Sequence, residues 1–515
     1  MKPALLAMMV GMSFQSCSVY QFKSGPPSVY RSNESTDALD SARPLVGVAI
    51  SGGGNRSALF ASYVLELLGS LPVEVLAPAN ATTPRQTSFL DTIGYISSVS
   101  GGGFAASYFG MKGLGRYDAL VSGGTVPKTY TDFFDGFHTT MNFDWAGTAL
   151  GLEGLTFGST ETRLSKVIDS QFLDGATFAD LDQHEASGTA PYLIFNATHY
   201  DSGRRFVMTT IPSSNFCLNT EQLLKDVVYA SGNQQYKIDP MYLQKIAQCD
   251  RKDPLTPEGF DSFSNPRMTS VPSTSFPISR AVATSASFPL AIGPVAYQID
   301  DDKAYLHLID GGVADNSGVE SITQLFLRKL IKNTQSRGLI VALDAGLPFN
   351  SRGTTIADAR LPVSTIIKDP ARLSDIQEVR ASLYRQDLWE VTEAVAKNMK
   401  KSSNAVTRLD IEQLQHIDLN VGSLRIDAGE CHEQLTDAKS VRDAVRDIPT
   451  NFHLDACSTQ LVRIAACWSV HQHAAAIQHL VDNLDGNDRK RSPDTSILDK
   501  RARAMCPELV SAGNL

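Results

Sequence analysis

From about residue 45, the chain alternates short apolar runs with stretches whose apolar residues recur at helical spacing. The run PLVGVAI, residues 44–50, is continuous and rich in β-branched residues, as in parallel strands that are buried on both faces. The stretch SALFASYVLELLGSL, residues 57–71, has the periodicity of an amphipathic helix. The sequence SGGGNR separates the two, so this region is predicted to form a strand, a glycine turn and a helix.

The same order recurs further along the chain. A predicted strand from Ile93 to Val99 is followed by a Ser-Gly-Gly-Gly turn and by an amphipathic helix from about Phe104. A later strand, Tyr305 to Ile309, ends in an Asp-Gly-Gly turn. This alternation predicts an α/β fold with a mostly parallel central sheet and helices on both faces. An aromatic-rich insertion and a helical C-terminal part complete the expected architecture.

The N-terminal sequence MKPALLAMMVGMSFQSC has one lysine, a short apolar run and then small polar residues, which is the pattern of a secretory signal. Cys17 at its end resembles the lipid-modified cysteine of bacterial lipoproteins, which implies a lipid anchor in the bacterial cell envelope. An ordinary cleaved signal, giving a periplasmic or secreted protein, and a buried N-terminal helix are the alternatives. No later apolar run reaches about 18 residues, so no transmembrane helix is expected.

The chain is therefore divided into residues 1–17 as a signal or lipoprotein-type segment, 18–44 as a polar tether, 45–482 as one α/β domain with an insertion at about 115–190, and 483–515 as a C-terminal tail. Beyond Cys17 the number of cysteines is even, which suits disulfides in an oxidising compartment, although buried thiols are the alternative. These cysteines are Cys217, Cys249, Cys431, Cys457, Cys467 and Cys506.

Composition narrows the classes of function. Of the 515 residues, 42% are hydrophobic and 20% charged, which is ordinary for a globular protein. The formal net charge of −9 argues against a general nucleic-acid binder, which is usually basic. The glycine turns match neither the phosphate-binding spacing G-x-x-x-x-G-K-[ST] nor the dinucleotide spacing G-x-G-x-x-G, so nucleotide binding is a poor interpretation.

Two segments carry expectations about architecture. Residues 128–158 are rich in aromatics and glycine, which suits a lid that contacts lipid as well as a buried helical insertion, and both interpretations stay open. Residues 370–420 are expected to form a charged amphipathic helix on the outside of the sheet.

Two of the predicted turns carry residues that could do chemistry. A sharp strand-to-helix turn exposes the hydroxyl of a serine such as Ser100, and the helix behind it favours negative charge. Asp310 ends its strand on a glycine turn, at the edge where open α/β sheets place their ligand crevice. Either turn alone is more often structural, but together with the first glycine turn they supply a nucleophile, a base and free backbone amides.

The glycine sequence SGGGNRS, the Ser100 turn and DGGVADNSG resemble, in order and spacing, the signature blocks of the patatin-like phospholipase family. The stretches IFNATHYDSGRRFVM, RAVATSASFPLAIGPV and DIPTNFHLDACSTQLVRIAACW agree, so the resemblance extends from about residue 45 to about residue 481. It implies a three-layer α/β/α fold. One departure is Ser98, which stands where the family's elbow has its first glycine.

The resemblance also implies the roles of individual residues. Ser100 is the expected nucleophile and Asp310 the base that takes its proton, without a histidine. The backbone amides of the glycine turn form the expected oxyanion hole. Arg56 is expected to support that turn or pair with an anion, and a salt bridge to a nearby carboxylate is the alternative. The residues that shape these turns are Gly52, Gly53 and Gly54 at the oxyanion hole, Gly101 and Gly102 at the elbow, and Gly311 and Gly312 after the aspartate.

The function implied is that of a serine hydrolase that cleaves acyl esters of lipids, phospholipids first among them, at a membrane surface. An acyltransferase with the same dyad, or a membrane-tethered lipid-binding protein without turnover, is the alternative. Neither a metal nor an organic cofactor is implied. His307 should face away from Asp310 because the two are three apart along one strand. Cys467 and His471 could form half of a metal site, but a solvated helix is favoured.

Overall fold

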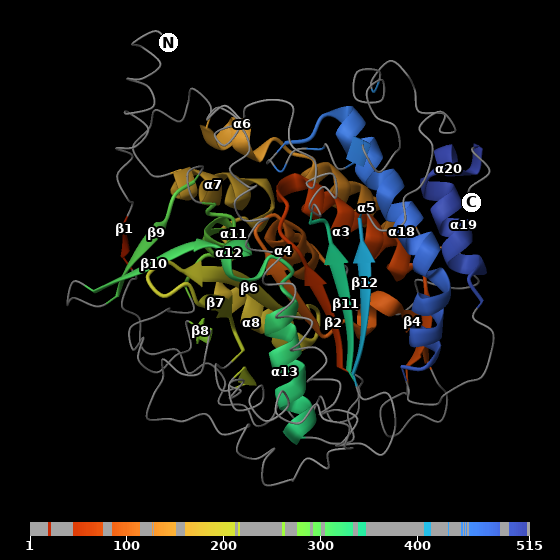
Figure 1. The fold of residues 1–515 in the computed structure, drawn as a ribbon, viewed down its shortest axis with the longest axis horizontal. Helices are drawn as coiled ribbons and strands as arrows, with labels where there is room; N and C mark the ends of the chain where they lie inside the picture. The colour runs from red at the N-terminus through yellow and green to blue at the C-terminus, as the bar shows by residue number, and fades with distance from the viewer. Residues whose placement is uncertain are drawn as a thin grey trace, which may run out of the picture.

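The computed structural model describes residues 19–21, 45–75, 85–113, 126, 128–150, 160–211, 215–216, 260–262, 275–288, 292–299, 304–332, 338–346, 406–413, 431, 444–445, 448, 450, 453–484 and 494–511. Figure 1 shows a central sheet with helices around it. The strands are β1 (Val19–Gln21), β2 (Leu45–Ile50), β3 (Pro72–Val75), β4 (Arg85–Ser88), β5 (Tyr95–Val99), β6 (Tyr192–His199), β7 (Arg205–Thr209), β8 (Phe260–Ser262), β9 (Val295–Ile299), β10 (Ala304–Asp310), β11 (Gly338–Asp344) and β12 (Val406–Glu412).

Among the described elements, one α-helix follows β2 and a run of five α-helices lies between β5 and β6. The described helices are α3 (Gly54–Gly69), α4 (Gly102–Lys112), α5 (Lys128–Met141), α6 (Trp145–Leu150), α7 (Thr160–Ile168), α8 (Phe178–Ser187), α11 (Ile278–Ser285), α12 (Gly312–Asp315), α13 (Val319–Lys332), α18 (Ala456–Asp482), α19 (Ser496–Met505) and α20 (Pro507–Ser511). A 3-10 turn (Phe89–Thr92) and a π-helical turn (Asp169–Leu173) complete the described elements.

Ten of the described strands form the central sheet, in the order β1-β9-β10-β6-β5-β2-β11-β12, with β7 and β8 continuing from β6. The five strands β6, β5, β2, β11 and β12 are parallel. By contrast, β10 pairs antiparallel with both β6 and β9, and β7 pairs antiparallel with β6. The predicted mostly parallel sheet is confirmed, and its antiparallel strands lie on the β6 side.

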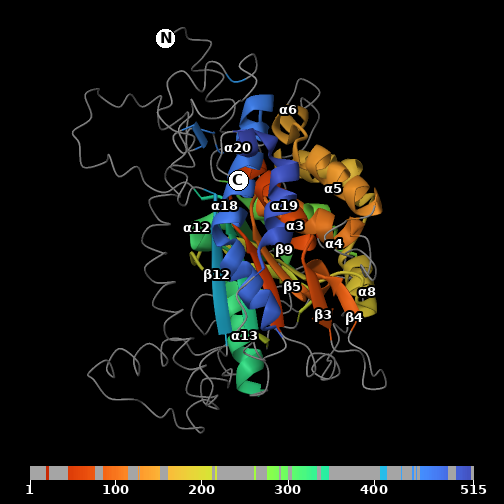
Figure 2. The ribbon, with the colours of Figure 1, turned by 90° about the vertical axis from the view of Figure 1, so that its right-hand side faces the viewer.

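Helices cover both faces of this sheet, as the apolar runs predict. Along β2, the side chains of Val46, Val48 and Ile50 pack into one core cluster, whereas those of Leu45 and Ala49 pack into the other. The first cluster includes residues of α3, α4, α5 and α18, and the second includes residues of α13. Figure 2 shows α4, α5 and α8 on the side away from α12 and α13. A strand buried on both faces needs apolar side chains at every position, which explains the unbroken run.

The aromatic-rich insertion is buried where the structure describes it. On α5, Tyr130, Phe134 and Phe137 are at most 1% exposed, and Trp145 at the start of α6 is fully buried. The ring of Trp145 lies 4.9 Å from that of Phe104 on α4, centroid to centroid. For α5 and the start of α6, the buried helical insertion is therefore the correct interpretation and the lid is not. Residues 151–159 lie outside the described part of the chain.

The C-terminal part is helical and packs on the sheet domain. Cys467 on α18 forms a disulfide with Cys506, which follows α19, and Cys431 pairs with Cys457. The Glu66 side chain on α3 forms an ion pair with Arg501 on α19. Cys217 and Cys249 lie outside the described residues.

The helix expected over residues 370–420 is wrong for its last part. Residues 406–412 form β12, which pairs in parallel with β11. Most of this strand is half-exposed, and a half-exposed strand tolerates charged residues. Its sequence therefore has no continuous apolar run like those of the central strands, and this is why the pattern does not predict a strand there. Residues 370–405 lie outside the described residues.

The structure describes only three residues of the N-terminal region for which a signal segment and a tether are predicted. Val19–Gln21, within the predicted tether, pairs with β9 in parallel, while Cys17 and residues 22–44 lie outside the described part. Among the described helices, none is both long enough and apolar enough to span a bilayer. The boundaries predicted for the tether, the insertion and the tail remain predictions.

Candidate active site

The glycine turn after β2 lies directly against the Ser100 turn. Gly53 and Gly54 have φ angles of +139° and +61°, a region that L side chains rarely adopt. A Cβ built on Gly52 would lie 3.5 Å from the Cβ of Ser100 and 2.1 Å from Oδ1 of Asn316. The glycines are therefore required both by the backbone conformation and by the close approach of the two other turns.

Ser100 occupies a strained position between β5 and α4. Its φ angle is +49°, one of two positive values among the described non-glycine residues. Such backbone strain costs about 1–3 kcal/mol and is typical of active sites, including the nucleophile turns of hydrolases. Gly101 allows the packing, because a Cβ there would lie 2.0 Å from the Gly54 carbonyl oxygen. Gly102 is equally confined, since its Cβ would lie 2.7 Å from the carbonyl oxygen of Ile50.

The unusual serine of the elbow is accommodated within the sheet. Ser98 is fully buried, and its hydroxyl donates a hydrogen bond to the carbonyl of Ile194 on β6, at 3.3 Å. Asn196 binds the same strand, because its side-chain amide donates to the carbonyl of Ser98 and to the hydroxyl of Ser97, both at 2.9 Å. These bonds anchor the end of β5, from which the Ser100 turn departs.

Asp310 reaches the site from a direction that the sequence does not indicate. Its strand β10 runs antiparallel to β6 and overlaps it at three positions, Leu308 to Asp310. Asp310 pairs with Ala197, the residue after Asn196, and Asn196 pairs with Val99 at the end of β5. The aspartate and the serine therefore flank β6 at the edge where the parallel strands end, although β10 itself is not parallel to them.

The hydroxyl of Ser100 lies close enough to the carboxylate of Asp310 to lower its pKa. Asp310 is 4% exposed, and its pKa is raised to about 6 because burial disfavours the charged form. The hydrogen bond from Ser100 and the bond from the Gly312 amide, at 2.7 Å to Oδ1, act in the opposite direction and limit this rise in pKa. A carboxylate with such a pKa can accept a proton from a neighbouring hydroxyl near neutral pH better than an ordinary aspartate.

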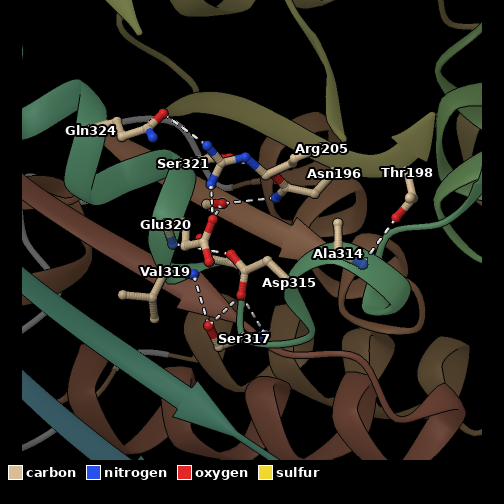
Figure 3. Close-up of polar contacts among 12 residues, drawn as sticks. Asn196, Thr198, Arg205, Ala314, Asp315, Ser317, Val319, Glu320, Ser321 and Gln324 are labelled. Carbon is tan, nitrogen blue, oxygen red and sulfur yellow. Dashed lines mark hydrogen bonds and ion pairs between the residues drawn. The ribbon is translucent and has the colours of Figure 1, made fainter. Parts of the chain in front are cut away.

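Polar side chains hold the segment that follows Asp310, from Ala314 to Gln324 (Figure 3). Thr198 on β6 donates its hydroxyl to the backbone carbonyl of Asp310, at 2.8 Å, and accepts from the Ala314 amide at 3.1 Å. Asp315, fully buried, accepts from the Ser317 amide at 3.0 Å and from the Glu320 amide at 3.1 Å. The loop from Asp310 to α13 is thereby fixed at both ends.

A second layer of this network ties α13 to the sheet. Arg205 on β7 is 3% exposed and donates to Glu320 at 3.0 Å and to Gln324 at 2.8 Å. Figure 3 shows its guanidinium between these two side chains, while Ser321 of the same helix contacts Asn196. Sequence reasoning missed these supporting residues, because bonds between side chains distant in sequence leave no periodic signal.

The predicted oxyanion hole requires one correction. The amide of Gly52 donates to the carbonyl of Asn316 at 2.8 Å, so it is not available to a substrate. The amides of Gly53 and Gly54 have no partner among the described residues. The bond from Gly52 also means that the loop that carries Asp310 holds the glycine turn in place.

Arg56 is a structural anchor in this fold. It is 1% exposed, and its Nε donates to the carbonyl of Ala345 at 3.2 Å. Its two terminal nitrogens donate to the carbonyl of Ile448 at 2.7 Å and to the hydroxyl of Thr450 at 3.1 Å. The guanidinium thus joins the glycine turn to the segment after β11 and to Ile448 and Thr450, which is the supporting role expected for it.

Replacing Arg56 by methionine should lower the free energy of unfolding by about 3 kcal/mol, because the buried carbonyls of Ala345 and Ile448 lose a charged donor. Urea denaturation of the variant measures this change. The matched control is Arg503→Met on the exposed face of α19, which should shift the free energy of unfolding by less than about 0.5 kcal/mol. Equal midpoints for both variants would contradict the anchoring role.

No described histidine contacts the serine or the aspartate. His307 lies on the opposite face of β10 and is half-exposed, with Nδ1 3.1 Å from Asp201, as the strand alternation predicts. His471 contacts Asp499 at 2.8 Å, and Cys467 is in a disulfide, so these two do not form half of a metal site. Within the described ranges, no group of three His, Cys, Asp or Glu side chains is placed to hold a metal ion.

Comparisons with known proteins place the chain in a family. Among solved structures, human GIVD cytosolic phospholipase A2 is similar, with 12% identity and a TM-score of 0.38. That match covers 88% of this chain and 64% of the human chain, so this chain spans less than two thirds of it. The search of curated proteins finds no match. The family model described as patatin-like phospholipase matches residues 48–322, more than half of the sequence and all three turns of the site. The chain belongs to the patatin-like phospholipase family.

Proposed function

We propose that this protein hydrolyses acyl esters of lipids, with phospholipids as the main substrates, through Ser100 and Asp310. The observation that carries the proposal is that a serine on a strained turn and a buried aspartate with a raised pKa flank β6 at the same edge of the sheet. The amides of Gly53 and Gly54, which have no partner among the described residues, lie in the turn packed against that serine. Membership of the patatin-like phospholipase family supports lipid esters as the substrate class.

The reaction begins with attack of the Ser100 hydroxyl on the ester carbonyl. Asp310 takes the proton of that hydroxyl as the new C–O bond forms, because a serine hydroxyl is a weak nucleophile until a base removes its proton. Asp310 then gives the proton to the leaving alcohol when the ester C–O bond breaks. Water attacks the resulting acyl-enzyme, with Asp310 again accepting a proton, and this releases the fatty acid and restores Ser100.

The negative charge that develops on the carbonyl oxygen is stabilised by backbone amides. In this proposal the donors are Gly53 and Gly54, which precede and open α3, so the positive end of the helix dipole adds to their effect. Removing one donor of an oxyanion hole typically costs about 100- to 1000-fold in rate. Glycine at both positions lets the substrate oxygen approach these amides without obstruction from a side chain.

The rate should rise with pH through the pKa of Asp310, which is raised to about 6 by burial. Below this pH the carboxyl is protonated and cannot accept the Ser100 proton, so kcat/KM should fall tenfold for each pH unit on the acidic side. The measurement is kcat/KM for a soluble ester between pH 4.5 and 8, at a temperature at which the protein stays folded. A profile that is flat across this range, or whose midpoint lies near 4, would count against Asp310 as the base.

The test of the proposed function combines labelling with product analysis. A fluorophosphonate probe should modify Ser100, as located by peptide mass spectrometry, and a panel of phospholipids and neutral esters should show release of fatty acid. Labelling without release from any ester would favour the lipid-binding alternative. Acyl transfer to an added alcohol in preference to water would favour the acyltransferase. Absence of labelling at Ser100 would remove the proposal.

The cell-envelope location and the lipid anchor at Cys17 are also proposals. The secretory pattern of residues 1–17 supports them, and the two disulfides of the C-terminal part suit an oxidising compartment. A membrane surface beside the enzyme would supply its substrate without diffusion of single lipid molecules through water.

A further inference from the structure

One buried hydroxyl outside the proposed dyad contacts the backbone of its nucleophile. Ser285, the last residue of α11, is fully buried. Its hydroxyl accepts a hydrogen bond from the backbone amide of Ser100 at 2.9 Å and donates one to the carbonyl of Asn196 on β6 at 2.5 Å. The side chain therefore bridges the nucleophile turn to the strand that separates it from Asp310.

The backbone around Ser285 holds the aspartate turn at the same time. The carbonyl of Ser285 accepts from the amide of Gly311 at 3.1 Å, and the carbonyl of Ser287 accepts from the amide of Asp310 at 3.0 Å. The last carbonyls of a helix have no partner within the helix and must be satisfied by other groups. Here the turn that carries the proposed base supplies those groups, so one short segment contacts both halves of the dyad.

The helix that carries this segment is itself firmly placed. All eight residues of α11 are buried, and Arg280 on it pairs with the buried Glu161 on α7 at 2.9 Å. The hydroxyl of Ser279 contacts that of Ser165 on α7 at 3.2 Å. These contacts involve the start and middle of α11 and do not involve Ser100 or Asp310.

We propose that Ser285 is a positioning residue, which fixes the orientation of the Ser100 turn so that its hydroxyl points at the Asp310 carboxylate. This inference rests on the proposed function. With a φ of +49°, the Ser100 backbone is held in a conformation that it would otherwise leave, and the bond from its amide to Ser285 opposes that relaxation. Misplacement of a reacting group by about 1 Å can lower a rate about 100-fold.

The experiment compares Ser285→Ala with Ser279→Ala, a matched control that removes a buried hydroxyl from the other end of the same helix. We expect Ser285→Ala to lower kcat for a soluble ester about 10- to 100-fold, with KM changed less than about twofold. The second-order rate of labelling by the fluorophosphonate should fall by a similar factor. Ser279→Ala should keep both rates, per titrated active site, close to those of the wild type.

A pH profile and a second variant distinguish a positioning role of Ser285 from a loss of stability and from failure of the proposed function. The acidic midpoint of kcat/KM should rise above its wild-type value in Ser285→Ala, because the carboxylate keeps its burial and its bond from Gly312 but loses the hydrogen bond from Ser100 that lowers its pKa. Ser285→Cys, which fills the same space with a weak hydrogen-bonding group, carries the test if the alanine variant does not fold. Wild-type rates in these variants would overturn the role of Ser285 alone, whereas absence of labelling in the wild type would overturn the dyad.

Discussion

Ester cleavage by the Ser100→Ala variant is expected to be at least about a thousandfold slower than by the wild type. The hydroxyl that attacks the carbonyl is gone, and among the described serines we identify no other that lies between the Asp310 turn and the glycine turn. Fluorophosphonate labelling should disappear along with the release of fatty acid. Substantial activity in this variant, normalised to folded protein, would mean that another residue is the nucleophile.

A second variant at this position isolates the backbone strain. Glycine adopts positive φ angles at little cost, so Ser100→Gly should be as inactive as Ser100→Ala but more stable by about 1 kcal/mol. Denaturation of the two variants under identical conditions measures this difference. If their midpoints coincide, the turn stores no strain that glycine can release.

The parts of the site that the sequence predicts are those governed by local geometry. A buried parallel strand followed by glycines and a helix leaves a clear pattern, and it placed Ser100 and the first glycine turn on the correct elements. The requirement for glycine at Gly101, by contrast, is not local: its φ of −54° suits any residue, and the group that it approaches, the carbonyl of Gly54, is distant in sequence.

The parts that the sequence does not predict depend on contacts between distant segments. An apolar run does not reveal strand direction, so the antiparallel entry of β10 is not evident from the residues before Asp310. Nor does a glycine reveal whether its amide is free, and the amide of Gly52 is occupied by the carbonyl of Asn316. Ser285 stands in a stretch of small residues where every position looks alike until the fold brings one hydroxyl to the Ser100 amide.

Composition alone also does not tell whether apolar side chains are buried in the protein or face a lipid. The aromatic side chains of residues 128–158 would suit a lipid-contacting lid and a buried insertion equally well. The structure buries those of α5 against α3 and α4, which makes this helix part of the domain core. A half-exposed strand such as β12 is also hard to recognise, because its polar positions resemble the exposed face of a surface helix.

Asp310→Asn should abolish ester cleavage as completely as Ser100→Ala, because an amide cannot accept the serine proton. Its effect on stability should nevertheless be favourable at neutral pH. Burial raises the pKa of Asp310 to about 6, above the value of about 3.9 that an aspartate has in an unfolded chain. The folded state therefore binds more protons than the unfolded state between these two pH values, and the wild type loses stability as the pH rises through that window.

The raised pKa of Asp310 also sets the size of the stability gain expected for Asp310→Asn. At pH 7 and above, the wild type carries a cost of about 3 kcal/mol for burying the charged carboxylate, and the neutral amide does not. The free energy of unfolding of Asp310→Asn should thus exceed that of the wild type by an amount that grows between about pH 4 and pH 6 and then stays constant. Ser100→Ala, equally inactive, keeps the carboxylate and should keep the decline in stability. A constant difference between the two variants across this range would show that the charge of Asp310 does not titrate there, and the base would have to be sought elsewhere.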